Sequence, residues 1–547
     1  MAEMAAAADV LTKKGSRLDS HMTTRPGRAS IALFLLALAG GLCYIALHVA
    51  RDMKTVTVTS TWPYLLLALA LLIALGFEFV NGFHDTANAV APVIYTHSME
   101  PIPAVVLSGF CNLLGVLVSS GAVAFAIITL LPVDLILQVS SGSGYAMVFA
   151  LLVAAILWNL GTWWLGLPAS SSHTMVGSII GVGIASQLFN PHTGTTGVDW
   201  EQAIKVLKAL LFSPLIGFFL AVLLMLLSKA LFRYPALYKA PENKQPPPWP
   251  IRVLMVITCS GVSFFHGSND GQKGMGLIML ILIGTVPTAY ALNHAVTAHD
   301  IQQFIAASEQ AGHILDRHAD QNASRVSDAR AEVTEYIRTR QLQPDTVPAL
   351  RKLVEDLDHE IAPYKELKAV PASRQAGVRN DMYVAGEAIR LMQKKDISLV
   401  KENKQPEFNT EESKALADYK SELDTSTRFI PNWVKVAVAL ALGLGTMVGW
   451  KRVVITVGEK IGKEHLTYAQ GACAGLVTMG TIFAADTYGL PVSTTHILSS
   501  GVAGTMAANG SGLRMSTIRN IAAVWVFTLP AAALLSGLLY ALFRLIH

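Results

Sequence analysis

Charged residues are scarce in this chain. They make up 15% of its 547 residues, against 52% hydrophobic residues, whereas soluble proteins are about a quarter charged. Mean hydropathy is +0.45. The charges are also concentrated, because residues 293–430 hold 23 of the 38 acidic and 19 of the 42 basic residues. The composition therefore excludes an ordinary soluble protein and indicates a membrane protein with one soluble insert.

Cysteines are few, and the common hydrolase motifs are missing. The chain has four cysteines, isolated in apolar runs without the spacing of a metal site or a disulfide: Cys43, Cys111, Cys259 and Cys473. Neither a His-Glu-x-x-His nor a Gly-x-Ser-x-Gly motif occurs. We therefore expect no enzymatic activity and no permanently bound cofactor. We also expect no nucleic-acid partner.

Long apolar runs recur along the chain. Runs able to cross the ~30 Å hydrocarbon core lie near 30–50, 62–81, 103–131, 145–167, 204–232, 433–450, 467–485 and 517–545. Four further runs are interrupted by polar motifs: 84–97, 169–188, 251–292 and 491–508. Irregular backbone at membrane depth is tolerated only where it is buried in protein or lines a cavity. We predict an all-α membrane protein with about 10–12 membrane segments, some of them broken or re-entrant.

The polar motifs form two copies of one pair. The first copy is 82–88 (GFHDTAN) with 166–173 (GLPASSSH), and the second is 267–273 (GSNDGQK) with 489–496 (GLPVSTTH). The separation from aspartate to histidine is 88 residues in the first copy and 226 in the second. The difference, 138 residues, equals the length of the charged segment 293–430. The sequence therefore predicts two repeats, the second carrying an insert.

Lysine and arginine orient the chain, because they favour the cytoplasmic side. With the basic N-terminal tail and the basic linker placed there, each repeat has an odd number of crossings. The repeats then have inverted topology, as in many transporters. The predicted organisation is a disordered cytoplasmic tail (1–29), an extra transmembrane helix (30–50), repeat 1 (62–232), a cytoplasmic linker (233–250), repeat 2 (251–292 and 431–545) and a soluble helical, periplasmic insert (293–430).

Each Gly-Leu-Pro turn is followed by three hydroxyl residues, Ser170, Ser171 and Ser172 in one copy and Ser493, Thr494 and Thr495 in the other. Proline at the first turn indicates a helix N-terminus, which carries free N–H groups and partial positive charge. With three hydroxyls beside it, such an end becomes an oxyanion cradle. Two cradles facing across a pseudo-twofold axis fit a tetrahedral anion such as phosphate. The alternative is that the triplets only cap helices or pack in small-residue interfaces.

Two aspartates, Asp85 and Asp270, accompany the cradles. They would repel a doubly charged anion unless a cation or a proton lies between them. Together with Asn88 and Asn269 they offer oxygen ligands for a cation that travels with the anion, and the two aspartates are its candidate metal ligands. For the second copy, a structural ion pair between Asp270 and Lys273 is the alternative.

Three further polar residues are accessory candidates. Glu78 precedes Asp85 by seven residues, which is two helical turns and the same helix face. His173 and His496 end the two hydroxyl motifs. They either orient the cradles through hydrogen bonds or are buried structural histidines.

Both motif pairs resemble the signatures of the inorganic phosphate transporter (PiT) family, Gly-x-Asn-Asp-x-x-Asn and Pro-x-Ser-Ser/Thr-Ser/Thr-His in each half. The stretches 81–90 and 266–274 closely resemble the bacterial low-affinity Pit-type members, and the resemblance covers nearly all of 62–545. It implies an inverted-repeat fold in the bacterial cytoplasmic membrane, with phosphate as substrate and arsenate as competitor. Assembly as a homo-oligomer stays open.

This chain departs from the family pattern at His84 and Lys273, where asparagines would stand. A lysine ammonium can take the place and charge of a bound sodium ion, and a histidine titrates near physiological pH. We therefore expect proton coupling, with phosphate carried as a neutral complex with a divalent cation such as magnesium, as is thought for the Pit-type members. The alternatives are a sodium-coupled symporter, a transporter of divalent cations or other oxyanions, and a phosphate receptor that does not transport.

Overall fold

The computed structural model describes residues 27–53, 62–85, 87–131, 142–189, 198–241, 246–320, 326–394 and 406–546. The regular secondary structure of these residues is helical, with only an isolated bridge between Gly462 and Leu513 as β-structure. Among them, seven helices are long and apolar enough to cross a membrane, or up to eight if a bent pair counts as one span. The prediction of an all-α membrane protein is confirmed. Most of the predicted tail, residues 1–26, lies outside the described residues.

The first repeat follows helix α3 (Arg28–Asp52). It contains α4 (Trp62–Asp85), α5 (Ala87–Tyr95), α6 (Pro101–Val118), α7 (Ala122–Ile128), α9 (Gly142–Trp164), α10 (Ser171–Phe189) and α11 (Trp200–Leu231), and a short 3-10 helix η2 (Pro235–Leu237) follows. The second repeat contains α12 (Trp249–Thr285), α13 (Pro287–Tyr290), α19 (Asn432–Thr446), α20 (Lys451–Ile455), a π-helical turn η4 (Thr456–Lys460), α21 (Tyr468–Thr487), α22 (Thr494–Asn509) and α23 (Met515–Ile546).

Helices of the two repeats pack against each other in exchanged pairs. Helix α6 packs on α12, and its counterpart α19 packs on α4; likewise α10 packs on α23, and α22 on α11. Each contact between a helix of the first repeat and a helix of the second therefore occurs twice, the second time between the counterparts of those two helices. Two half-structures related by a twofold axis produce this pattern, and it brings the matching motifs of the two halves to the same interface.

Contacts along the pairs give the helix directions. Glu78 of α4 lies against Gly274 of α12, whereas Arg252, near the start of α12, donates from Nε to the carbonyl of Ser98 after α5 at 2.8 Å. Residue numbers therefore rise along α4 and α5 as they fall along α12. The two segments are antiparallel, which is the relation expected of repeats with inverted topology.

The structure differs from the expectation at the second motif. The segment 251–292 was expected to be interrupted there, but α12 is an unbroken helix from Trp249 to Thr285. The glycines of this motif lie instead at close contacts between helices. A Cβ at Gly267 would clash with the carbonyl of Asn112, and one at Gly274 with the Glu78 carboxyl. Small residues let helices approach closely in a membrane. Glycine therefore serves helix packing here.

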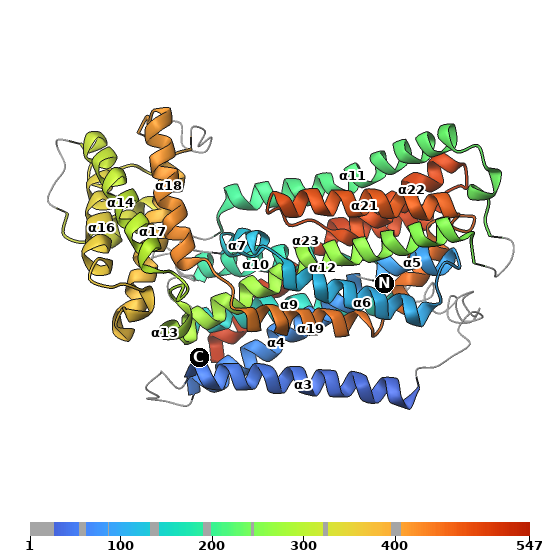
Figure 1. Cartoon of the computed structure of the whole chain (residues 1–547), viewed down its shortest axis with the longest axis horizontal. Helices are drawn as coiled ribbons and strands as arrows, with labels where there is room; N and C mark the ends of the chain where they lie inside the picture. Colours follow the sequence, from blue (N-terminus) through green and yellow to red (C-terminus); the bar gives the residue numbers. More distant parts are fainter. Residues whose placement is uncertain are drawn as a thin grey trace.

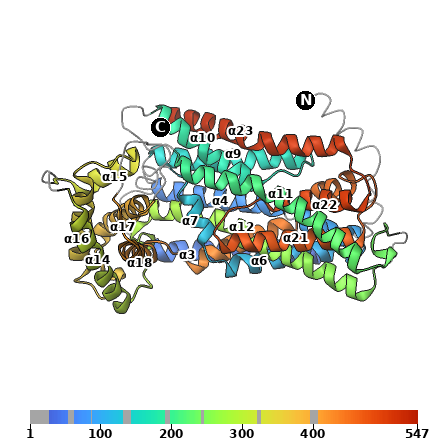
Figure 2. The same cartoon turned by 90° about the horizontal axis from the view of Figure 1, so that it is seen from above.

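The insert lies at one end of the molecule, beyond the membrane helices (Figures 1 and 2). Its helices are α14 (Ala298–His318), α15 (Ala329–Thr339), α16 (Thr346–Ile361), the 3-10 helix η3 (Leu367–Ala369), α17 (Ala372–Met392) and α18 (Thr410–Thr427). They enclose a core of their own that includes Leu350, Val378 and Tyr419. We call this end of the molecule the insert end. Its predicted periplasmic location stays a prediction.

Candidate functional site

Both hydroxyl triplets lie at the start of a helix, as predicted. Helix α10 begins at Ser171 and α22 at Thr494. The preceding hydroxyls, those of Ser170 and Ser493, accept the backbone N–H three residues ahead, each at 3.2 Å. This is the N-cap arrangement, in which a side-chain oxygen satisfies one of the free N–H groups of a helix start. In each copy, one hydroxyl of the triplet is therefore engaged in capping.

The Asp85 carboxylate at the end of α4 joins the two helix starts. Its Oδ2 accepts the hydroxyl of Ser171, and its Oδ1 accepts the hydroxyl of Thr495 at 2.9 Å. The Ser171 hydroxyl also lies 3.2 Å from Asp270 Oδ2. All four side chains are buried. The structure thus brings both predicted cradles and both predicted aspartates into one buried cluster.

Lys273 makes the predicted ion pair and also reaches the first cradle. Its Nζ lies 2.6 Å from Asp270 Oδ1, 2.5 Å from Ser172 Oγ and 3.5 Å from the carbonyl oxygen of Val492. The lysine side chain is only 1% exposed. A buried charge is tolerated only when it is paired and hydrogen-bonded. Oxygen atoms from both repeats therefore surround one fixed positive charge.

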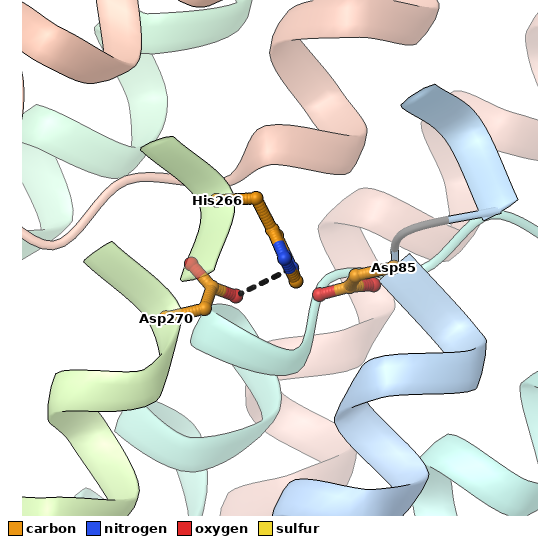
Figure 3. Close-up of side chains that lie close together, drawn as sticks. All are labelled: Asp85, His266 and Asp270. Carbon is orange, nitrogen blue, oxygen red and sulfur yellow. Dashed lines mark ion pairs between the residues drawn. The ribbon is translucent and has the colours of Figure 1, made fainter. Parts of the chain in front are cut away.

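Asp85, His266 and Asp270 form a second, adjoining cluster (Figure 3). Each offers one ligand atom, and these atoms all lie within 4.8 Å of one another. Carboxylate oxygens suit hard cations such as magnesium, and an imidazole extends the range to softer metals such as zinc. The donor set fits a divalent cation.

The cluster includes a residue that sequence reasoning missed. His266 Nε2 lies 3.6 Å from Asp270 Oδ2, and its Nδ1 lies 2.9 Å from Asn112 Oδ1. The sequence position of His266, one helical turn before Asp270, could have indicated it, because residues four apart share a helix face. Asn112, on α6, holds the ring in place.

Of the remaining predicted residues in the aspartate motifs, His84 contacts a carboxylate, whereas Asn269 contacts the backbone. His84 Nδ1 lies 2.9 Å from Asp85 Oδ1, and its Nε2 lies 3.1 Å from Thr162 Oγ1. Asn269 bonds to the backbone, donating to the carbonyl of Leu490 at 3.0 Å and accepting the N–H of Val492 at 3.3 Å. It therefore positions the loop before α22. The side chain of Asn88 lies outside the described part of the structure.

The two motif histidines lie side by side, with ring centroids 4.4 Å apart. His173 Nδ1 lies 3.0 Å from the capping hydroxyl of Ser170. His496 stacks on Trp525 at 4.1 Å between centroids, and the indole N–H of Trp525 bonds to the carbonyl of Pro168 at 3.1 Å. These contacts lock the two helix starts together.

Several buried polar groups near the site lack full hydrogen bonding among the described residues, and two of them bear on its function. The hydroxyl of Thr494, the second member of its triplet, has no partner. Glu78 Oε2 accepts from Asn81 at 3.3 Å, whereas Oε1 lies against Gly274 without a well-formed hydrogen bond. A buried polar group without a partner calls for an explanation, such as an unoccupied ligand contact or a functional role.

The fold and the site define a membrane transporter with two inverted repeats whose paired helix starts meet at buried carboxylates. The sequence model of the phosphate transporter family matches residues 81–536. The chain belongs to this family, so the resemblance of its motifs is confirmed and an enzyme is excluded.

Curated relatives align with this chain along nearly their whole length. The low-affinity inorganic phosphate transporters PitB and PitA of Escherichia coli (strain K12) are 39% and 41% identical to this chain, and each alignment covers 87% of it and 96% of the relative. A probable low-affinity inorganic phosphate transporter of Bacillus subtilis (strain 168) is 27% identical, over 88% and 99%. A solved structure described as the sodium-dependent phosphate transporter aligns with a TM-score of 0.49 and 19% identity, over 88% of this chain and 100% of that one.

Proposed function

We propose that this chain is a low-affinity inorganic phosphate transporter of the bacterial cytoplasmic membrane that imports phosphate by proton symport and alternating access. The substrate follows from the chemistry of the two triplets and from the names of the relatives, which are phosphate transporters. The coupling ion follows from the chain's own residues, above all from Lys273. That one observation carries the proposal.

The two helix starts form the phosphate site. Each supplies free N–H groups and a partial positive charge, and together they supply hydroxyls from Ser170, Ser171, Ser172, Ser493, Thr494 and Thr495. The Thr494 hydroxyl, which has no partner among the described residues, can donate a hydrogen bond to a phosphate oxygen. Ser171 and Thr495 donate to Asp85, and they exchange this carboxylate for phosphate when the substrate enters.

Proton coupling rests on the oxygen cage around Lys273. The ammonium contacts a carboxylate, a hydroxyl and a carbonyl, which are the oxygen ligands that a sodium ion would use. An ammonium group here takes the place and the charge of a sodium ion, so this position needs no sodium ion. His84, hydrogen-bonded to Asp85, and Glu78, with its unsatisfied oxygen, are then the groups that take up and release the proton.

The cation that accompanies phosphate would bind at Asp85, His266 and Asp270. These residues lie beside the helix starts, so a divalent cation there and a phosphate on the triplets would adjoin. The pair would cross as a neutral complex. Neutrality removes most of the cost of moving a doubly charged anion through the low-dielectric membrane interior.

Uptake of labelled phosphate into proteoliposomes tests the proposal, with proton, sodium and magnesium conditions imposed separately. We expect an inward proton gradient to drive accumulation without sodium, and magnesium to stimulate it. Arsenate should compete and sulfate should not. Uptake that needs a sodium gradient and ignores the proton gradient would establish the sodium-coupled alternative. Binding without accumulation would indicate a receptor.

A further inference from the structure

A pocket of about 680 Å³ lies at the insert end, where the insert meets the membrane helices. Its walls come from α7, the start of α11, the turn 487–489, the end of α17 and α18. We call it the basic pocket, because one acidic side chain, Glu201, lines it together with five cationic ones: Lys205, Arg390, Lys394, Lys420 and Arg428.

Ion pairs hold the insert in this position. Arg340 and Arg390 both bond to Asp199, the N-cap residue of α11, at 3.1 and 3.2 Å, and Lys394 pairs with Glu201. These contacts fix the insert side of the pocket against the start of a membrane helix. The basic pocket is therefore a joint feature of the insert and the transport repeats.

The pocket keeps an excess of positive charge after these pairs are counted. Arg390 pairs with a second acid, Glu387, whereas Lys420 and Arg428 share one acid, Asp424. Lys205 forms no ion pair in the described part of the chain and is exposed. A concave surface with charge of one sign concentrates counter-ions and raises their rate of association. The preferred ligand of this pocket is an anion.

The wall of the pocket continues into the phosphate site. Gly489 lines the pocket, and Val492 is three residues further along, a distance of at most about 11 Å for an extended chain. The carbonyl of Val492 accepts the Ser172 hydroxyl and faces Lys273. An anion in the basic pocket is thus separated from the hydroxyl triplets by one short segment.

We propose that the basic pocket is an outer phosphate site, in which the insert and the membrane helices together collect the phosphate anion before it reaches the triplets. This inference rests on the proposed function and assigns a task to the insert. Capture acts on the free oxyanion, so the accompanying cation joins at the inner cluster. The pocket has cations but no buried hydroxyl cradle, so it attracts sulfate as well as phosphate, and the triplets select between them.

The test compares Lys205→Gln and Lys205→Glu with the matched Lys208→Glu in proteoliposomes. Lys208 is an exposed lysine one turn along the same helix, and it does not line the pocket. At low salt, with phosphate added on the insert side, we expect Lys205→Gln to raise KM about threefold and Lys205→Glu about tenfold. The maximal rate should change less, and Lys208→Glu should leave KM at the parent value.

The same experiment includes three further measurements of KM. Salt at about 0.5 M, where the Debye length is about 4 Å, should abolish the difference between Lys205→Glu and parent. Phosphate supplied from the opposite side should show no difference at any salt. Glu201→Gln, which removes the acid from the lining, should lower KM. An unchanged KM in Lys205→Glu at low salt, or an equal rise in Lys208→Glu, would overturn the outer site while leaving phosphate transport intact. Absence of uptake by the parent protein would instead overturn the proposed function.

Discussion

Lys273 and Asp270 form a buried ion pair one helical turn apart on α12, with Nζ 2.6 Å from Oδ1. The same ammonium lies 2.5 Å from the hydroxyl of Ser172 at the first cradle. One side chain therefore contacts both a carboxylate in the membrane interior and a hydroxyl of the proposed phosphate site. A phosphate on the triplets would meet a fixed cation there and would need less charge from mobile ions.

Lys273→Asn should weaken the dependence of phosphate uptake on the proton gradient. The substitution removes the fixed charge and restores an oxygen ligand, which reopens the position for a mobile cation. Loss of one partner of a buried pair also costs about 3–5 kcal/mol of stability, so the variant must first be shown to be folded by its elution from a sizing column. Uptake is measured against imposed pH gradients at constant membrane potential. Lys273→Arg, which keeps the charge, is the control, and unchanged coupling in the asparagine variant would refute the charge-replacement argument.

Thr494→Val should impair phosphate binding without destabilising the protein. The hydroxyl has no partner among the described residues, so its loss leaves no other group unsatisfied, whereas a hydrogen bond to a charged phosphate contributes about 1.5–3 kcal/mol. We expect KM for phosphate to rise about tenfold or more, with an unchanged melting temperature. Thr505→Val on the same helix is the control, because within the described residues that hydroxyl bonds only to the carbonyl of Val502. A lower melting temperature with an unchanged KM would mark Thr494 as a packing residue.

The repeat pattern and the position of both hydroxyl triplets at helix starts could be predicted from sequence, whereas anion binding there stays a prediction. Hydrocarbon thickness fixes the length of apolar runs, and the matched spacing of the motifs made the insertion of 293–430 visible. The prolines and hydroxyls marked the starts of α10 and α22 because these residue types satisfy the unpaired groups of a helix start. Local chemistry determined these features, and local chemistry can be read from sequence.

The positions of His266 and Asn269 could not be predicted in the same way. Their roles depend on which residues lie opposite, Asn112 for the histidine and the backbone at Leu490 for the asparagine. The unbroken course of α12 was missed for a related reason. Glycine at a helix break and glycine at a close helix contact look the same in sequence, and only the partner helix distinguishes them.

Glu78→Gln should separate proton coupling from phosphate binding. A buried carboxyl, with one oxygen that lacks a well-formed hydrogen bond among the described residues, can bind a proton at membrane depth, where ionisable groups usually serve transport, whereas an amide cannot. We expect uptake driven by a pH gradient to fall about tenfold, while exchange of internal for external phosphate, which needs no net proton movement, continues. Glu100→Gln, at an exposed position before α6, should change neither rate. If gradient-driven uptake and exchange fell together in Glu78→Gln, the carboxyl would be structural.

Asp358 gives the insert a pH-dependent stability. Burial raises the pKa of this carboxyl to about 6, although the Ser308 hydroxyl donates to it at 2.5 Å. In the unfolded chain its pKa is about 4, so the folded state binds the proton more tightly. The stability cost of the charge is absent below pH 4 and complete above pH 6. Because the side chain is only half-buried, this cost is about 1 kcal/mol rather than the full value of the shift.

Asp358→Asn should therefore raise the free energy of unfolding of the insert at pH 8 and leave it unchanged at pH 4, as measured by scanning calorimetry on the full chain. Asp356→Asn, at an exposed position on the same helix, should show no such dependence; a benefit of Asp358→Asn that is equal at both pH values would instead reflect packing.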